Sequence, residues 1–115
     1  SDSPQVNIDV NTSARALAED VYEVALFVRG EAKSDDKTVF IVELTYGGII
    51  TLNDVPEENV QPLLLIEAPR HLFPFARGIV ANVTRDGGFP PLLINPMDFV
   101  SLYNEAQTEP EASTE

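Results

Sequence analysis

The sequence predicts an α+β domain built on an antiparallel sheet, with helices packed on one face of that sheet. Alternation of apolar and polar residues, which is typical of strands, is confined to residues 6–52. Helical periodicity longer than one turn appears only after that stretch. Strands that precede helices in this order favour an antiparallel sheet. Because 115 residues support one hydrophobic core, we predict a single domain over residues 1–106.

The first two strands are predicted from period-two patterns. Val6, Ile8 and Val10 alternate with polar residues and predict a short, half-buried strand. Residues 12–20 fit a capped helical turn and a polar strand linker equally well, since a Thr-Ser pair can cap and alanine favours helices. Residues 20–29 predict the second strand. Its drier face carries Tyr22, Val24, Leu26 and Val28.

A charged turn over residues 33–37 leads into a third strand over residues 38–46, which predicts a hairpin. We expect Gly47 and Gly48 to interrupt this strand with a bulge or bend before residues 49–52 resume it. One face of the third strand mixes Ile41 with the acidic Glu43. The other face is apolar throughout and carries Phe40, Val42, Leu44 and Tyr46.

Prolines set the helix boundaries that we predict. Asn53 or Asp54 can cap a short helix that reaches about Ile66, is broken by Pro62 and is closed by Pro69. A second helix should begin at residues 71–73, because Pro74 cannot lie deep inside it. Its stop is a pair of glycines, Gly87-Gly88. The apolar face of this helix carries Phe73, Ala76, Val80 and Val83.

An extended arm and a terminal helix complete the predicted fold. Pro90 and Pro91 stiffen residues 89–94, and Asn95 and Pro96 suit the N-cap and first position of a helix that ends near residue 105. That helix should bury Phe99 and Leu102, and in part Tyr103. Residues 107–115 are acidic, small and proline-containing, so we predict a disordered tail there.

The charge balance limits the classes of partner. Nineteen acidic residues against seven basic ones give a net charge of −12, which argues against binding a nucleic-acid backbone and favours a basic partner. The chain has no cysteine, which fits the reducing cytoplasm. Its longest apolar run, residues 63–66, is too short to insert directly into a membrane.

The residues offer little for catalysis, and we predict no enzyme, no cofactor and no metal site. His71 is the single histidine, so neither a catalytic triad with cysteine nor a site with two imidazoles can be assembled. The neighbouring carboxylates at residues 35–36 and 57–58 are typical of solvated turns. Exposed apolar residues such as Phe27, Ile41 and the arm instead indicate subunit contacts or a groove for an extended peptide, although scattered exposure is ordinary.

Six segments, taken together and in order, resemble the SecB family of bacterial export chaperones. They cover most of residues 4–104, and no single one is specific by itself. The segments are residues 6–10 (VNIDV), 20–24 (DVYEV), Glu43 with 46–49 (YGGI), 72–77 (LFPFAR), 87–92 (GGFPPL) and 96–99 (PMDF).

The resemblance implies a cytoplasmic, ATP-independent chaperone that holds unfolded preproteins and passes them to the SecA motor, working as a homotetramer that is a dimer of dimers. By the same resemblance, Ile41 and Glu43 contact SecA. The implied client-peptide groove is lined by Val6, Ile8, Val10, Phe99, Leu102 and Tyr103. The implied oligomer interface consists of Phe40, Val42, Leu44, Tyr46, Phe73, Ala76, Val80 and Val83.

One departure from the family pattern concerns the start of the chain. SecB-like chains open with an additional strand and a crossover loop before the segment that matches Val6, so we expect a fourth strand upstream and interpret these residues as a fragment or a truncated member. An alternative within the same fold is a SecB-like chaperone of a toxin-antitoxin system, whose client is an antitoxin.

Overall fold

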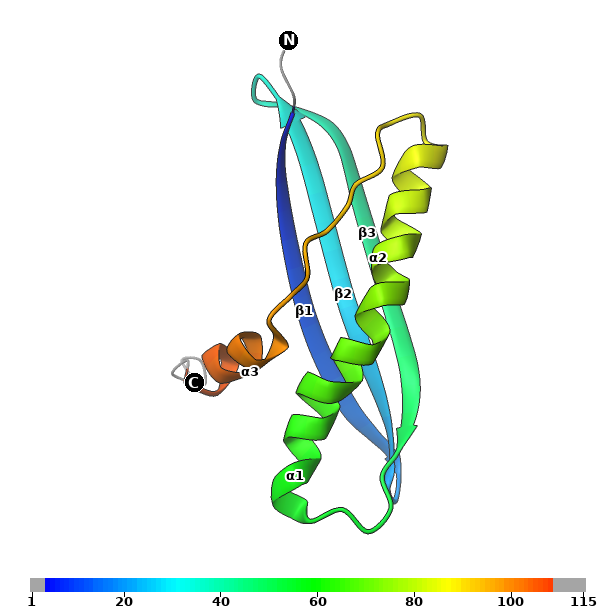
Figure 1. The fold of residues 1–115 in the computed structure, drawn as a ribbon, viewed down its shortest axis with the longest axis vertical. Helices are drawn as coiled ribbons and strands as arrows, with labels where there is room; N and C mark the ends of the chain where they lie inside the picture. The colour runs from blue at the N-terminus through cyan, green and yellow to red at the C-terminus, as the bar shows by residue number, and fades with distance from the viewer. Residues whose placement is uncertain (1–3, 109–115) are drawn as a thin grey trace.

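The computed structural model describes residues 4–108, which form a three-stranded antiparallel sheet with helices on one face (Figure 1). The prediction of the fold class is therefore confirmed. The strands lie in the order β1-β2-β3, and β2 is central. Their bounds are β1 Gln5–Ala18, β2 Val21–Ser34 and β3 Lys37–Thr51. The helical elements are α1 Glu57–Pro62, the π-helix η1 Leu63–Glu67, α2 Ala68–Asp86 and α3 Phe99–Thr108.

The strands are longer than the sequence patterns predicted. β1 continues through the stretch for which a helical turn and a linker were equally plausible, because residues 12–16 pair in register with β2. Two aspartates, Asp35 and Asp36, both have positive φ (54° and 68°) and close the β2–β3 hairpin. Pairing of long β1 and β3 with a central strand thus overrides the weak local preference of residues 12–20.

The predicted interruption at Gly47 and Gly48 is wrong. Both glycines pair regularly with β2, opposite Ala25 and Val24, and the register shift of this hairpin lies instead beside Ala32. A Cβ built on Gly48 would lie 3.3 Å from Leu72 Cδ2 of α2. Gly48 therefore serves the close approach of the helix to the sheet.

The prediction of two helices separated at Pro69 is also wrong. Residues 57–86 are helical without a break, and α2 begins at Ala68, so that Pro74 lies inside it. Pro69 sits in the first turn of α2, directly after the wider π turn of η1, where its missing amide is tolerated. An internal proline costs about 3 kcal/mol. Burial of each large apolar side chain of α2 on the sheet contributes about 1.5–3 kcal/mol and offsets that cost.

The end of α2 is built as predicted. Gly88 has φ +95°, the N–H of Phe89 donates to the Thr84 carbonyl (3.1 Å), and the N–H of Gly88 donates to the Arg85 carbonyl (3.0 Å). These two bonds form the Schellman motif, in which only glycine adopts the left-handed position without strain. The chain is thereby turned back over the sheet.

The segment between α2 and α3, residues 89–98, crosses the helix-bearing face from the end of α2 towards β1 (Figure 1). We call it the arm. The Phe89 ring lies 4.7 Å from that of Phe40 on β3, and the side chain of Ile94 is buried. Leu92 lies over Gly30, where a Cβ would come within 2.9 Å of Leu92 Cδ2.

The start of α3 differs from the predicted one. The helix begins at Phe99, and Asp98 caps it in place of Asn95: Asp98 Oδ1 accepts a hydrogen bond from the Ser101 N–H (3.1 Å). The helix runs to Thr108, so residues 107 and 108 are helical and not part of a disordered tail. The rest of the predicted tail, residues 109–115, lies outside the described residues.

The main core lies between the sheet and the long helix, and the arm closes it from one side. No helix within residues 4–108 is long and apolar enough to cross a membrane. The buried residues of this core are Val10, Leu26, Val28, Val42, Phe73, Ala76, Val80, Ile94 and Phe99.

Candidate functional site

The apolar residues of β1 point to the face that carries the helices and the arm, and their exposure falls along the strand. Val6 is 42% exposed, Ile8 is half-buried at the rim of the main core, and Val10 is buried in it. Cross-strand pairing places Ile8 beside Gly30, directly where Leu92 of the arm approaches. Val6 and Ile8 are thus accessible beside the arm, whereas Val10 belongs to the core.

The predicted groove residues of α3 divide in the same way. Phe99 is 2% exposed and packs edge-on against Phe73, with ring centroids 5.8 Å apart. Leu102 and Tyr103 are half-buried and keep accessible surface. Phe99 and Val10 are core residues of the described chain, so their side chains offer almost no accessible surface, and the groove itself stays a prediction. Val6, Ile8, Leu102 and Tyr103 remain accessible candidates.

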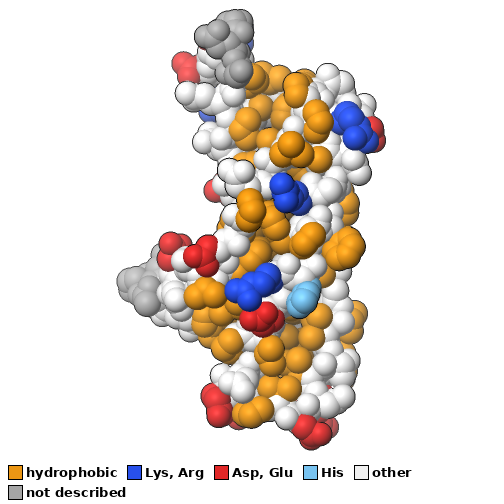
Figure 2. Space-filling model, viewed as in Figure 1, with side chains coloured by type: hydrophobic (Ala, Val, Ile, Leu, Met, Phe, Trp, Pro, Cys, Tyr) orange, Lys and Arg blue, Asp and Glu red, His pale blue; other side chains and the backbone are white. Residues whose placement is uncertain are grey.

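Three further apolar residues on this face were missed in the sequence. Leu93 on the arm is 66% exposed, Val100 on α3 is 40% exposed, and Met97 between them is half-buried. The signal was the alternation in the arm, where Leu92 and Ile94 point inward and Leu93 points outward. Figure 2 shows hydrophobic side chains gathered along the length of this face, with charged side chains scattered between them.

The opposite face of the sheet is not covered by a helix of the described chain, and Ile41 and Glu43 both lie on it. Ile41 is 49% exposed. The Glu43 side chain is 69% exposed, and its Oε2 accepts a hydrogen bond from Arg29 Nε at 3.2 Å. We call this surface the open face.

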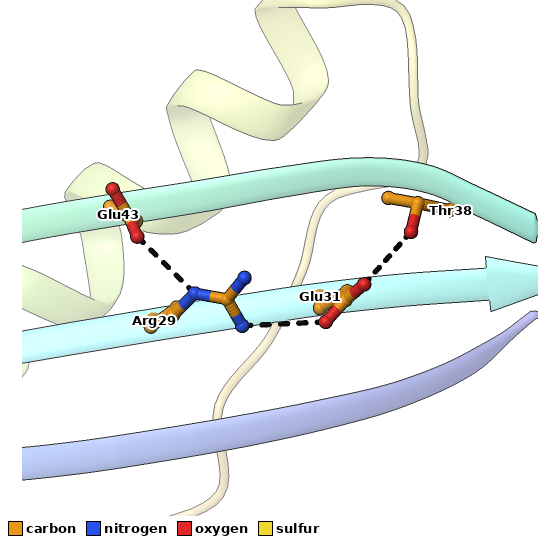
Figure 3. Close-up of polar contacts among 4 residues, drawn as sticks. All are labelled: Arg29, Glu31, Thr38 and Glu43. Atoms are coloured by element: carbon orange, nitrogen blue, oxygen red, sulfur yellow. Dashed lines mark hydrogen bonds and ion pairs between the residues drawn. The ribbon is translucent and has the colours of Figure 1, made fainter.

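Arg29 links two carboxylates on the open face (Figure 3). Besides Glu43, its Nη1 contacts Glu31 Oε1 at 3.4 Å, and Thr38 donates a hydrogen bond of 2.8 Å to the other oxygen of Glu31. The bond from Thr38 is the main reason why the pKa of Glu31 lies below its ordinary value; desolvation opposes this shift, and Arg29 and the charge of Lys33 lower the pKa further. The network keeps Glu31 ionised.

A hollow of about 440 Å³ lies on the open face beside this network. Phe27, which is 40% exposed, is its aromatic side chain. Strand pairing places Phe27 between Asn11 and Thr45, and Arg29 between Asp9 and Glu43. The lining residues are Asp9, Asn11, Phe27, Val28, Arg29, Glu43, Leu44 and Thr45. The hollow therefore combines an aromatic ring with charges of both signs.

The residues predicted to form an oligomer interface lie on the helix-bearing side. Half of them pack inside the chain itself and offer little or no accessible surface to a second subunit, because α2 of the same chain covers the sheet. These four are Val42, Phe73, Ala76 and Val80, none of which is more than 8% exposed, and their part in an oligomer interface stays a prediction.

The remaining four predicted interface residues keep some accessible surface. Val83 is 52% exposed, and Phe40, Leu44 and Tyr46 are half-buried. Phe75, which was missed, is 62% exposed and stacks on Tyr46 with ring centroids 6.3 Å apart. The β3 side of α2 therefore presents an apolar stripe.

No group of three or more histidine, aspartate or glutamate side chains within residues 4–108 could hold a metal ion. His71 is exposed on α2. The described surface has an apolar face beside the arm and a mixed, charged face on the other side of the sheet.

Comparison with known proteins agrees with the SecB resemblance. Residues 1–110 match a model of the family described as preprotein translocase subunit SecB. The chain is 56% identical over 102 residues to a protein-export protein SecB of Bradyrhizobium sp. (strain BTAi1 / ATCC BAA-1182), covering 89% of this chain and 63% of the relative. It is 47% identical to protein-export protein SecB 1 of Gluconobacter oxydans (strain 621H), covering 98% of this chain and 72% of that one.

A solved structure shares the fold at low sequence identity. It is the Mycobacterium tuberculosis SecB-like chaperone Rv1957 in complex with a ChAD peptide from the HigA1 antitoxin, with a TM-score of 0.66 and 13% identity, covering 84% of this chain and 75% of that one. The chain spans about 63% of the length of the Bradyrhizobium relative that it matches.

Proposed function

Because this chain belongs to the SecB family of protein-export chaperones, we propose that it is an ATP-independent holdase that binds unfolded preproteins in an apolar groove and delivers them to the SecA motor. The observation that carries the proposal is the apolar surface around the arm of a strongly acidic chain. Val6, Leu93 and Val100 are each at least 40% exposed there. Such a chaperone acts in the cytoplasm, where unfolded preproteins await export.

The groove is suited to extended chains of many sequences. Its accessible residues come from β1, the arm and α3, so they form an elongated surface in place of a closed pocket. Burial of apolar area contributes about 25 cal/mol per Å² whatever the order of the client's side chains. Specific hydrogen-bond partners are not required for such binding. The proposed lining consists of Val6, Ile8, Leu93, Val100, Leu102 and Tyr103.

Replacing two exposed groove residues tests client binding. The double variant Val6→Ser/Leu93→Ser should weaken capture of an unfolded preprotein by about tenfold, since roughly 1.4 kcal/mol of apolar burial is lost. Dissociation constants measured by fluorescence anisotropy with a labelled, reduced preprotein give the comparison.

Ile49→Ser is the matched control, because Ile49 is 61% exposed but lies on the open face. Its dissociation constant should equal that of the unaltered chain. If the double variant and the control bind the preprotein equally well, the groove has been placed wrongly.

We propose that SecA docks on the open face, at Ile41 and Glu43. The support is the combination of an exposed apolar side chain and an exposed carboxylate in a chain of net charge −12, which suits a basic partner with apolar residues. Glu43→Lys should weaken SecA binding, and the loss should shrink at high salt. Glu58→Lys, on the exposed surface of α1, is the control with the same change in charge.

Assembly into a dimer of dimers would bury the apolar stripe on the β3 side of α2. Val83, Phe75 and Tyr46 are the residues that we propose for this contact. Several grooves on one tetramer would raise the affinity for one long client through effective concentration.

A second candidate function is suggested by the structural neighbour, which is a SecB-like chaperone with an antitoxin peptide. The groove proposed here could hold an antitoxin segment by the same apolar contacts. Competition decides between the two functions: if unlabelled preprotein fails to displace a bound antitoxin segment at any concentration while the antitoxin segment binds tightly, the antitoxin function is favoured.

A further inference from the structure

Arg29 forms an ion pair with Glu43, the carboxylate that we propose as a SecA contact. Its Nε donates to Glu43 Oε2 at 3.2 Å, and its Nη1 lies 3.4 Å from Glu31 Oε1. The side chain of Arg29 is 42% exposed, so this contact faces solvent and can open. Glu43 is therefore ion-paired within the free chain.

The two carboxylates held by Arg29 are not equivalent. Glu31 is only 18% exposed and also accepts the Thr38 hydrogen bond, so it stays fixed if Arg29 moves. Glu43 is 69% exposed, and Arg29 gives it a single contact through Nε. An incoming cation would therefore replace Arg29 at Glu43, while Arg29 could remain beside Glu31.

We propose that Arg29 is an internal competitor for Glu43, which a basic segment of the partner must displace in order to dock on the open face. This inference rests on the proposed SecA function and adds a specificity-determining residue to its surface. The occupant is a basic polypeptide segment with an apolar residue beside its cation, because the hollow places the exposed Phe27 next to the Arg29–Glu43 pair.

Competition by Arg29 selects among cations. Exchanging one ion pair for another adds little binding free energy when the new pair is no stronger than the old one. A lysine offers Glu43 a point charge, whereas an arginine can offer both nitrogens of its fork to the two carboxylate oxygens. Arg29, which uses one nitrogen on Glu43, is thus displaced more readily by arginine than by lysine. Arg29 consequently biases the open face towards arginine-bearing segments.

The test measures SecA binding to the full chain with Arg29→Gln, by isothermal titration at low and moderate salt. Removing the competitor should tighten binding about two- to fivefold, the range expected for an exposed ion pair. Arg15→Gln is the matched control: Arg15 also lies on the open face and pairs with Glu23 at 2.7 Å, but towards the other end of the sheet. It should tighten binding by less than twofold.

A double variant separates competition from general charge. In a Glu43→Gln background, Arg29→Gln should no longer change SecA affinity, because the carboxylate for which they compete is gone. Circular dichroism of each variant should match the unaltered chain, since all three side chains are on the surface.

Other results would refute either the competition by Arg29 or the docking surface itself. Weaker binding by Arg29→Gln would show that Arg29 contacts SecA directly and would overturn the competition, as would equal tightening by Arg15→Gln. If SecA binds the unaltered chain but Glu43→Gln has no effect, the proposed docking surface fails, and the Arg29 inference fails with it. If Glu43→Gln weakens binding and Arg29→Gln leaves it unchanged, the docking surface stands and only the competition is refuted.

Discussion

Thr84 is the buried polar residue that ties the arm to α2. It is 4% exposed; its Oγ1 donates to the carbonyl of Val80 (2.9 Å) and accepts a hydrogen bond from the N–H of Leu92 (2.9 Å). A hydroxyl is the side-chain group that can do both at once in so small a volume. Thr84 therefore adds a hydrogen bond to the apolar contacts that hold the arm over the sheet.

Thr84→Val should remove the acceptor while keeping the shape of the side chain. The N–H of Leu92 would lose its partner, which costs about 1–3 kcal/mol. We expect a lower midpoint of urea unfolding and faster amide exchange in the arm. Thr51→Val, at an exposed end of β3, is the control and should leave both measurements nearly unchanged. Unchanged exchange of the Leu92 amide in Thr84→Val would contradict this role.

Asp98 caps α3 in its ionised form. The hydrogen bond donated by Ser101 Oγ (2.8 Å), with the Ser101 N–H adding to it, holds the pKa of Asp98 below its ordinary value. A folded-state pKa lower than the unfolded one means that the cap stabilises α3 at neutral pH, and that this contribution is lost as pH falls through the folded-state value.

Titration by NMR of the Asp98 carboxyl carbon should therefore give a midpoint below the ordinary aspartate value. Ser101→Ala should raise that midpoint, because the main donor is removed. In Asp98→Asn the amide oxygen can still cap the helix, so α3 should persist while its dependence on acid pH disappears. A midpoint that Ser101→Ala leaves unmoved would refute this explanation.

At the scale of elements, a glycine within α2 and a glycine in the turn after it have opposite requirements. Gly88 has φ +95° in the turn that ends the helix, whereas Gly78 lies within the helix, where a Cβ would meet no atom within 4 Å. A side chain at position 88 would strain the backbone, whereas a side chain at position 78 should stabilise the helix.

Gly88→Ala should destabilise the fold by about 1–2 kcal/mol, the cost of a left-handed conformation for a residue with a Cβ. Gly78→Ala should stabilise it by about 0.5–1 kcal/mol, since alanine replaces glycine in an exposed helix interior. Thermal unfolding of both variants provides the comparison. If the two variants shift the midpoint of thermal unfolding in the same direction, this account of the glycines is wrong.

The elements also show which features the sequence could predict. Strand faces, the glycine stop of α2 and the extended conformation of the arm followed from local patterns of apolar residues, glycine and proline. The continuous helix through Pro69 and Pro74 could not be predicted, because it depends on packing against the sheet and on the π turn before it. Local rules for proline describe its cost but not what offsets it.

Local patterns also predicted part of the candidate surfaces: they assigned residues to a face of the sheet but did not determine their exposure. Period-two alternation placed Ile41 and Glu43 together on one face and Val6 with Ile8 on the other. It did not show that Val10 would be buried, nor that Leu93 would point outward. The burial of Phe99, by contrast, was predicted from the terminal helix and is confirmed. Exposure depends on which element covers a face, and that is decided by the whole chain.

For the whole molecule, the apolar stripe on the β3 side of α2 bears on assembly. Multi-angle light scattering at micromolar concentration should give a mass of about four times 12.6 kDa if the proposed tetramer forms from these residues. Phe75→Lys should lower that mass, because it places a charge in the proposed contact. Leu93→Lys, on the arm, is the control and should not. A monomeric, folded species for the unaltered chain would exclude the tetramer.

The sheet is a single layer, and its two faces carry the two proposed surfaces. A client beside the arm and a motor on the open face would be separated by the thickness of one backbone, so neither would block access of the other. A ternary complex is then the natural intermediate of delivery, and the motor would not evict the client by taking its place. Transfer would instead depend on how fast the client dissociates segment by segment and how effectively the adjacent motor captures each freed segment.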